Sequence, residues 1–313
     1  MQYYLAPLEG ITTYVYRNAY HRHFHPMDKY FTPFIVPHKE KKFSTREKKE
    51  LSPENNQGLF VVPQLLTNNA EDFLKTAKDI TAFGYEEINL NLGCPSGTVV
   101  AKNKGSGFLS FPDELDRFLH KIFNAADFKI SVKTRIGKEQ PEEFYRLLEI
   151  YNKYPLEELI VHPRVQTDFY KNKPNWDMYE VAYKKSMSPI CYNGDLFSVT
   201  DCYKLEKHFP DTDTIMLGRG IIANPALVSQ LIGRDDFTKE KLLSFHNMIY
   251  DEYKQISSGD RNVLFKMKEL WFYMAGLFEE SEKYMKKIKK SERLKEYDKV
   301  IQLLFENCIL KEG

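Results

Sequence analysis

Eight short strand-like runs, separated by longer segments of helical period, constrain the fold of this chain more than any other feature. The runs are rich in β-branched and aromatic residues and lie near residues 3–7, 30–36, 59–66, 87–93, 129–135, 159–164, 190–195 and 214–220. Amphipathic segments long enough for a crossover helix lie between most of them, such as residues 69–84, 111–126 and 142–154. Strands and helices that alternate in this way predict a (β/α)8 barrel, or TIM barrel.

A doubly wound open sheet is the alternative to a barrel. Such a sheet usually carries a G-x-G-x-x-G turn after its first strand, whereas "APLEGIT" follows the first run here. The strand-like runs then stop, and residues 238–313 show an almost continuous helical pattern. We therefore expect a barrel domain over residues 1–236 and a small all-helical domain over residues 237–313.

Composition excludes several classes of protein. The formal net charge of +1 gives no global bias toward nucleic acid or membrane, so any polyanion site must be a local patch. The four cysteines form no C-x-x-C pair or zinc-type cluster, so we expect neither a metal site nor a disulfide framework. The chain has no basic start followed by an apolar run and no long apolar stretch. It is expected to be cytoplasmic, without a membrane segment or an obligate protein partner.

Polar residues stand at the ends of six predicted strands, where barrel enzymes carry their reactive groups. One such residue alone is usually a solvated loop residue, but six strand ends together predict one site. These residues are Gln64, Asn91, Cys94, Lys133, Arg135, His162, Arg164, Asn193, Asp195 and Arg219.

Glycines predict a phosphate site after the last two strands. "YNGD" at residues 192–195 and "GRG" at 218–220 allow backbone amides to approach an anion, and Asn224 and Pro225 suit the start of a short helix behind them. Barrels often bind phosphate at that corner. Sugar phosphates and flavin mononucleotide (FMN) fit it equally well.

Lys133 and Cys94 limit the reactions that this site could catalyse. A strand-end lysine can stabilise negative charge on a reduced flavin, or form a Schiff base as in barrel aldolases. A cysteine thiol has a pKa of roughly 8.5, so it is mostly protonated at neutral pH and can act as a general acid. Asn89 and Asn91 alternate with Ile88 and Leu90, which puts both amides on one face of the strand before Cys94.

These motifs together resemble the tRNA dihydrouridine synthases. They occur in order as LAPLEG, VPQLL, NLNLGCPSGTV, GSGFL, SVKTRIG, VHPR, YNGD and IMLGRGIIANP, from residue 4 to about 230. LAPLEG is similar to the subgroup whose start reads A-P-M-E-G. One departure is Val165, where members commonly continue His-small-Arg with Thr.

The resemblance implies an oxidoreductase in which NADPH, or NADH, reduces FMN, and the flavin then reduces the C5–C6 bond of a uridine in tRNA. Cys94 would protonate C5, while Asn91 and Arg164 would contact the substrate. Pro7, Leu8 and Glu9 would pack by the isoalloxazine, with Gln64 and Lys133 at its pyrimidine edge and His162 against the flavin or its phosphate. The phosphate and ribityl chain would be held by Asn193, Gly194, Asp195, Gly218 and Arg219.

A basic segment near the C-terminus suits an RNA partner. Residues 283–295 contain seven basic residues in thirteen. Such a run alone is usually a solvated helix face, but after a barrel of this kind we expect tRNA phosphates to contact Lys286, Lys287, Lys289 and Lys290. The same helix is expected to carry an apolar stripe of Tyr284, Met285, Ile288 and Leu294.

Two other functions use the same barrel. A flavoenzyme like dihydroorotate dehydrogenase would act on a free pyrimidine and would not need the basic segment. A non-catalytic RNA-binding barrel would tolerate the loss of Gln64, Lys133 and Cys94, yet all three are present.

Overall fold

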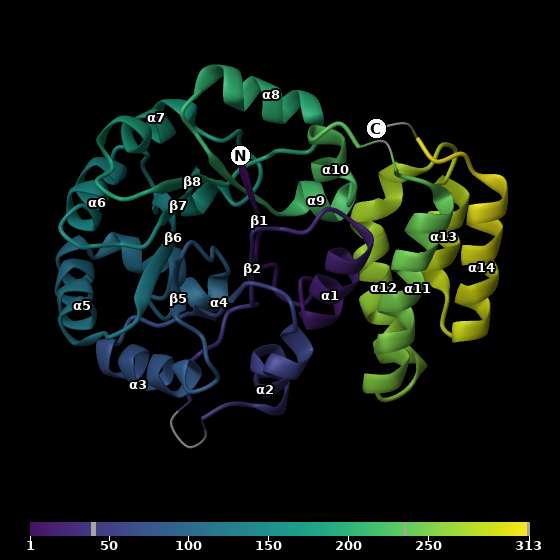
Figure 1. Cartoon of the computed structure of the whole chain (residues 1–313), viewed down its shortest axis with the longest axis horizontal. Helices are drawn as coiled ribbons and strands as arrows, with labels where there is room; N and C mark the ends of the chain where they lie inside the picture. Colours follow the sequence, from purple (N-terminus) through teal and green to yellow (C-terminus); the bar gives the residue numbers. More distant parts are fainter. Residues whose placement is uncertain (39–41, 235, 312–313) are drawn as a thin grey trace. The chain divides into compact units, whose positions relative to one another are not determined.

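The computed structural model, which describes residues 1–38, 42–234 and 236–311, contains a parallel sheet built from the eight predicted runs (Figure 1). The strands are β1 (Gln2–Leu5), β2 (Lys29–Phe31), β3 (Val61–Val62), β4 (Gln64–Leu65), β5 (Glu87–Leu92), β6 (Lys129–Gly137), β7 (Leu159–Val165), β8 (Ile190–Tyr192) and β9 (Thr214–Leu217). One run gives both β3 and β4, because Pro63 between them has no N–H for the ladder.

The sheet closes on itself at Pro63. Its hydrogen-bonded order is β3-β2-β1-β9-β8-β7-β6-β5-β4, so the first and last strands are neighbours in the chain. Beyond β2, the Ile35 N–H donates to the Gln64 carbonyl at 2.8 Å and the Leu66 N–H donates to the Ile35 carbonyl at 2.9 Å. These bonds join the segment that follows β2 to the segment of β4. The predicted barrel is confirmed, and the doubly wound alternative is wrong.

Helices alternate with the strands along the chain. They are α2 (Thr45–Leu51), α3 (Ala70–Thr81), α4 (Gly97–Val100), α5 (Pro112–Ala125), α6 (Glu143–Tyr151), α7 (Trp176–Lys185) and α8 (Val199–His208), with 3-10 turns η1 (Pro53–Asn56), η2 (Gly105–Ser110) and η3 (Gln166–Asp168). The three named predictions, at residues 69–84, 111–126 and 142–154, are confirmed as α3, α5 and α6. Apolar residues at helical spacing form their buried faces, as Phe73, Ala77 and Ile80 do on α3. The rings of Phe73 and Phe118 pack edge to face at 6.0 Å between α3 and α5.

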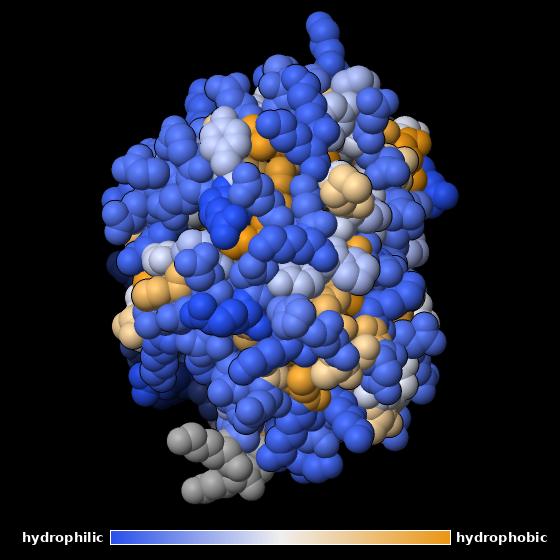
Figure 2. All heavy atoms as spheres, turned by 90° about the vertical axis from the view of Figure 1, so that its left-hand side faces the viewer, coloured by the Kyte–Doolittle hydropathy of each residue, from blue (hydrophilic) through white to orange (hydrophobic). Residues whose placement is uncertain are grey.

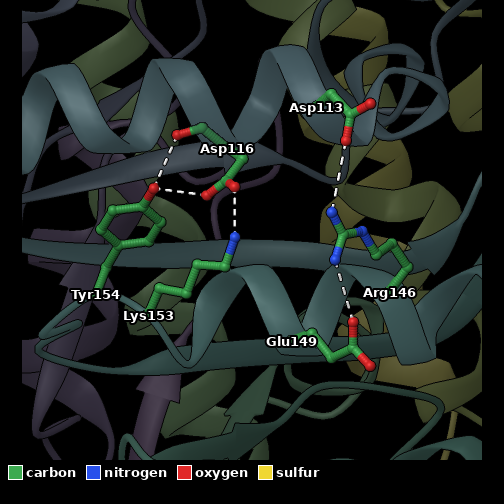
Figure 3. A network of polar contacts seen from close by, with 6 residues as sticks. All are labelled: Asp113, Asp116, Arg146, Glu149, Lys153 and Tyr154. Atoms are coloured by element: carbon green, nitrogen blue, oxygen red, sulfur yellow. Dashed lines mark hydrogen bonds and ion pairs between the residues drawn. The ribbon is translucent and has the colours of Figure 1, made fainter.

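The outer surface over α5 and α6 is mostly hydrophilic, with small separate hydrophobic spots (Figure 2). Polar contacts join the two helices there (Figure 3). The Tyr154 hydroxyl donates to Asp116 Oδ1 at 2.6 Å, Lys153 pairs with the same carboxylate, and Arg146 pairs with Asp113 at 3.5 Å. Exposed ion pairs contribute at most about 1 kcal/mol each. The ion pairs of this network therefore add little stability.

The chain forms two compact units, and all nine strands belong to the first. That unit comprises Met1–Pro7, Asp28–Asp195 and Lys204–Leu217, and the second comprises Leu8–Met27, Leu196–Tyr203 and the chain from Gly218 onward. Helices of the second unit are α1 (Tyr14–His23), α9 (Arg219–Ala223), α10 (Leu227–Leu231), α11 (Lys239–Ile256), α12 (Asp260–Met274), α13 (Glu282–Lys290) and α14 (Leu294–Asn307), with the turn η4 (Ala275–Leu277). The helical C-terminal region is thus confirmed, while the boundary at residue 236 stays a prediction.

An aromatic core holds the C-terminal helices together. The Trp271 indole N–H donates to the Tyr297 hydroxyl at 2.8 Å, and that hydroxyl is 2.6 Å from His246 Nε2. Burial lowers the pKa of His246 to about 4, so the ring is neutral and its Nε2 accepts a hydrogen bond from the Tyr297 hydroxyl. Within the described part of the chain, no helix has both the length and the apolar character needed to span a bilayer.

Candidate active site

Four buried side chains on β4, β5 and β6 form one hydrogen-bonded chain at the site. Asn89 Nδ2 donates to the Ser131 hydroxyl at 2.9 Å, and Gln64 Nε2 donates to Asn89 Oδ1 at 2.8 Å. Asn91 Nδ2 in turn donates to Gln64 Oε1 at 2.7 Å. The two asparagines share a face, as the strand alternation predicts. Buried amides that bond one another in this way fix the positions of their side chains.

This chain of amides ends at the backbone of Cys94. Asn91 Oδ1 accepts the N–H groups of Cys94 at 2.9 Å and Gly93 at 3.1 Å. On the other side, the Ser106 hydroxyl and N–H donate to the Cys94 carbonyl at 2.8 and 3.1 Å. Gly105 has φ +56°, and a Cβ there would lie 2.8 Å from the Cys94 carbonyl oxygen, so only glycine fits. The partly exposed Cys94 is therefore held from both sides at the carboxyl end of β5.

Lys133 lies on β6 directly opposite Asn91 in the β5–β6 register. Among the described residues, none gives its ammonium a hydrogen bond or an ion pair. Burial of the ammonium, together with the charge of Arg135, lowers the pKa of Lys133 to about 8, although the side chain keeps some exposure. The group is still mostly protonated at neutral pH. It is a cation available to a bound anion.

Arg135 ties the loops after β5 and β7 together. Its Nε donates to the Gly93 carbonyl at 3.1 Å, Nη1 to the Val165 carbonyl at 2.8 Å, and Nη2 to the Phe169 carbonyl at 2.8 Å. Its guanidinium carbon also lies 5.5 Å from the centre of the Tyr170 ring. The buried guanidinium thus fixes one loop against the other.

His162 and Asp195 are both bonded to Arg164, which is 1% exposed. Arg164 Nη1 lies 3.0 Å from His162 Nε2 and from Asp195 Oδ1, Nη2 pairs with Asp195 Oδ2, and Nε donates to the Asn172 carbonyl at 2.6 Å. A guanidinium only donates, so His162 Nε2 accepts, and the neutral ring carries its proton on Nδ1. The predicted contacts of these residues with substrate and cofactor stay predictions.

Pro7, Asn193 and Gly194 follow β1 and β8 in the same unit. The Asn193 amide donates to the Met216 carbonyl at 2.8 Å and so joins the end of β8 to β9. A Cβ on Gly194 would lie 3.0 Å from the Tyr192 hydroxyl, which leaves little room for a side chain. Both residues are placed to shape a tight turn. Their predicted role in holding a phosphate stays a prediction.

The remaining predicted cofactor residues belong to the second unit. The Leu8 N–H donates to Thr12 Oγ1 at 2.7 Å, and Glu9 is exposed. Arg219 follows Gly218 at the start of α9, and its guanidinium carbon lies 5.4 Å from the centre of the Phe197 ring. They too remain predicted cofactor contacts.

The expected helix start at Asn224 and Pro225 is wrong. Asn224 ends α9, and α10 begins at Leu227. The reason is local, since Asn224 Oδ1 accepts the Ala226 N–H at 3.1 Å in a turn of its own.

The basic segment forms α13, and its four predicted phosphate contacts are exposed: Lys286, Lys287, Lys289 and Lys290. Tyr284 and Ile288 are buried on the opposite face. Leu294 lies outside this helix, contrary to expectation, because α13 ends at Lys290 and Leu294 begins α14. The predicted stripe is therefore shorter than expected.

Ser131 and Ser106 take part in the site although the sequence analysis does not assign them. Ser106 stands between Gly105 and Gly107, and a Cβ on Gly107 would lie 2.9 Å from the Val100 backbone. Two glycines around a serine indicate a close backbone approach, which is the signal for Ser106. Ser131 stands on the same face as Lys133, two residues earlier, and that spacing is its signal.

Comparison with known sequences decides the family. The sequence model of the family described as Dihydrouridine synthase (Dus) matches residues 4–311. The chain belongs to the dihydrouridine synthase family. It is thereby an oxidoreductase, as the resemblance implies.

Individual relatives in this family bear related names. "Probable tRNA-dihydrouridine synthase" of Staphylococcus aureus strain Mu50 is 27% identical over 262 residues, which cover 80% of this chain and 78% of that one. "tRNA-dihydrouridine synthase B" of Pasteurella multocida is 24% identical over 282 residues, which cover 88% of this chain and 84% of that one. Among solved structures, a variant of NCR from Zymomonas mobilis aligns with a TM-score of 0.51 at 12% identity over 78% of this chain and 90% of that one. This likeness shows the fold alone.

Proposed function

We propose that this chain is a tRNA-dihydrouridine synthase that reduces the C5–C6 double bond of a uridine in tRNA, with FMN bound and NADPH, or NADH, as reductant. The Cys94 loop is the observation that carries the proposal. Asn91 and Ser106 hold this loop at the carboxyl end of β5, next to the ammonium of Lys133 on β6, which has no ion-pair partner among the described residues. Membership of the dihydrouridine synthase family supports the same reaction.

Lys133 fits the flavin that the family resemblance implies. A protonated ammonium without a partner among the described residues stabilises negative charge at a pyrimidine edge. Gln64 has one amide N–H beyond the one that it gives to Asn89, and that N–H is available to the same edge. FMN, when bound, supplies the hydride that uracil C6 receives.

Cys94 supplies the proton in this mechanism. The S–H bond breaks as a C–H bond forms at uracil C5, and the sulfur keeps the electron pair as a thiolate. Because Cys94 is partly exposed, water can return a proton to it after each turnover. Cys191 cannot act as the proton donor, because it lies buried in β8 and burial raises the pKa of its thiol well above the usual range.

The exposed lysines of α13 bind the tRNA. Each lysine that neutralises a phosphate releases condensed counterions, so affinity depends strongly on salt and little on sequence. A tRNA substrate agrees with the cytoplasmic location expected from the sequence.

The two other functions are distinguished by their substrates. A free-pyrimidine flavoenzyme would turn over orotate and ignore tRNA, and a non-catalytic barrel would turn over neither. Family membership and the exposed lysines of α13 favour tRNA.

Product analysis tests the proposal. The purified protein, reconstituted with FMN, is incubated with NADPH and unmodified tRNA, and the nucleosides are measured by mass spectrometry. We expect dihydrouridine in the tRNA and no turnover of free orotate. Orotate reduction without dihydrouridine would establish the free-pyrimidine enzyme. Failure to bind FMN, with no product from either substrate, would establish the non-catalytic barrel.

A further inference from the structure

Phe169, in the loop after β7, combines an unusual backbone with an exposed ring. Its φ of +49° lies in a region that bulky residues rarely adopt, and the side chain is 44% exposed. Within the described chain, no aromatic ring or cationic group contacts the Phe169 ring, whereas the next residue, Tyr170, lies over Arg135. A residue with a strained backbone and an aromatic ring exposed to solvent is a candidate for a functional role.

The Phe169 backbone is fixed to the Cys94 loop. Its carbonyl accepts Arg135 Nη2 at 2.8 Å, and its N–H donates to the Gln166 carbonyl at 3.1 Å. The same guanidinium donates through Nε to the carbonyl of Gly93, the residue before Cys94. One buried side chain therefore sets the position of the Phe169 backbone relative to the loop that carries the thiol.

The loop around Phe169 is positively charged where it meets solvent. Lys171 and Lys173 are both exposed. The nearby acid, Asp168, is engaged within the loop, because its carboxylate accepts the Val165 N–H and the Asn172 amide. An exposed aromatic ring beside two lysines is the combination that binds a nucleobase and its phosphate backbone.

We propose that Phe169 is a stacking platform for a nucleobase of the bound tRNA that flanks the target uridine, with Lys171 and Lys173 supplying charge for its backbone. This inference rests on the proposed function, because it takes tRNA as the substrate. Every base has a π face, so the contact is tolerant of sequence and raises affinity for different tRNAs alike. The fixed backbone means that little freedom is lost when the base stacks.

Binding of unmodified tRNA to Phe169→Gly tests the inference. Glycine adopts a positive φ without strain, so this change removes the ring and keeps the loop. We expect tRNA affinity to fall about ten- to hundredfold, the usual effect of losing one base–aromatic stack. The slope of log Kd against log salt should stay constant, because no charge is removed.

Two variants serve as controls. Phe169→Trp keeps an aromatic face and should bind tRNA close to wild-type affinity. Tyr145→Ala removes an aromatic residue of similar exposure, 46%, from the outer helix α6 and should change nothing.

Wild-type affinity in Phe169→Gly would overturn the inference, and so would equal losses in Phe169→Gly and Phe169→Trp, since the ring would then not matter. Both results leave the proposed function standing if the wild-type protein still forms dihydrouridine. If wild type neither binds tRNA nor forms dihydrouridine, the proposed function itself fails.

Discussion

The Cys94 loop of the barrel and helix α13 are built in opposite ways. Around Cys94, buried amides bond one another and the backbone at 2.7 to 3.1 Å, and the nearby Lys133 ammonium has no hydrogen-bond partner among the described residues. On α13 the four lysines are exposed, and no described residue forms an ion pair with them. One region has fixed geometry and few available groups, while the other has many charges and little fixed geometry.

Because of this difference, the Cys94 loop should affect the rate of the reaction, and α13 should affect the affinity for tRNA. A proton transfer needs its donor at hydrogen-bonding distance from the reacting carbon, so a buried network that holds the donor acts on the rate. Exposed charges act over several ångströms and are screened by salt, so they act on affinity and association. Changes in the two regions should therefore alter different measured quantities.

The largest effect is expected at Cys94. Cys94→Ala should lower dihydrouridine formation by about a hundred- to ten-thousandfold, because general acid catalysis contributes that much. Its Kd for tRNA should stay at the wild-type value. Cys191→Ala is the matched control, since that thiol is fully buried in β8, and its turnover should change little. A loss of affinity as large as the loss of turnover in Cys94→Ala would show that Cys94 acts on tRNA binding and not on the rate of the reaction.

Charge reversal on α13 should have the next largest effect, on binding alone. Changing Lys286, Lys287, Lys289 and Lys290 to Glu should weaken tRNA binding about a hundredfold near physiological salt and flatten the log–log salt dependence by up to about 3 to 4 units. NADPH oxidation by the flavoprotein without tRNA should be unchanged.

A second charge reversal with the same change in net charge controls for long-range electrostatics. It replaces four exposed lysines on the outer barrel helices α3, α5 and α7 by Glu: Lys75, Lys78, Lys121 and Lys185. Equal weakening in both variants would show that net charge matters and that α13 is an ordinary solvated helix face.

Glu158, just before β7, lies in the barrel but takes no part in the hydrogen bonds around the thiol, so its effect should be on stability alone. Burial raises the pKa of Glu158 to about 7, and its Oε1 accepts the Tyr4 hydroxyl at 3.1 Å. Between about pH 4.5 and 7 the unfolded chain loses this proton and the folded chain keeps it, so rising pH destabilises the fold. The free energy of unfolding of wild type relative to Glu158→Gln should fall by about 3 kcal/mol across that range.

Urea unfolding of both proteins at several pH values measures this difference. A constant difference from pH 4.5 to 7 would contradict the raised pKa. Turnover per folded molecule should be similar in the two proteins at pH 6, since Glu158 is not part of the thiol's network.

The smallest effect is expected on FMN binding, when Arg219 is replaced. Arg219→Ala should weaken FMN binding by at least about tenfold, because a hydrogen bond to a charged group contributes about 1.5 kcal/mol or more. The measurement is the FMN that remains bound after extensive dialysis. Arg234→Ala, at an exposed arginine elsewhere in the second unit, is the control. Unchanged FMN retention in Arg219→Ala would remove Arg219 from the phosphate site.

Local periodicity was enough to predict most of the fold. The run 87–93 alternates aliphatic and amide residues and became β5, and the segment 69–84 carries apolar residues at helical spacing and became α3. Two details were not predicted. The run 59–66 is interrupted at Pro63, and the helix expected over residues 283–295 ends before Leu294. Both details depend on single residues, which a periodic pattern does not resolve.

The site could be predicted only as a set of residues. Strand order brings the ends of β4, β5 and β6 together, which is why Gln64, Asn91 and Lys133 could be grouped. Their bonds could not be predicted, since Gln64 and Asn89 are 25 residues apart and Asn89 and Ser131 are 42 apart. The closed barrel and its register determine which amide groups bond to each other.

Stopped-flow spectrophotometry of the FMN-loaded Cys94→Ala protein tests whether this thiol donates the proton to uracil C5. The flavin absorbance is followed first on mixing with NADPH and then, after reduction, on mixing with unmodified tRNA. The account predicts flavin reduction at the wild-type rate and reoxidation by tRNA slower by about a hundred- to ten-thousandfold. Reoxidation of Cys94→Ala at the wild-type rate would contradict it and show that another group delivers the proton.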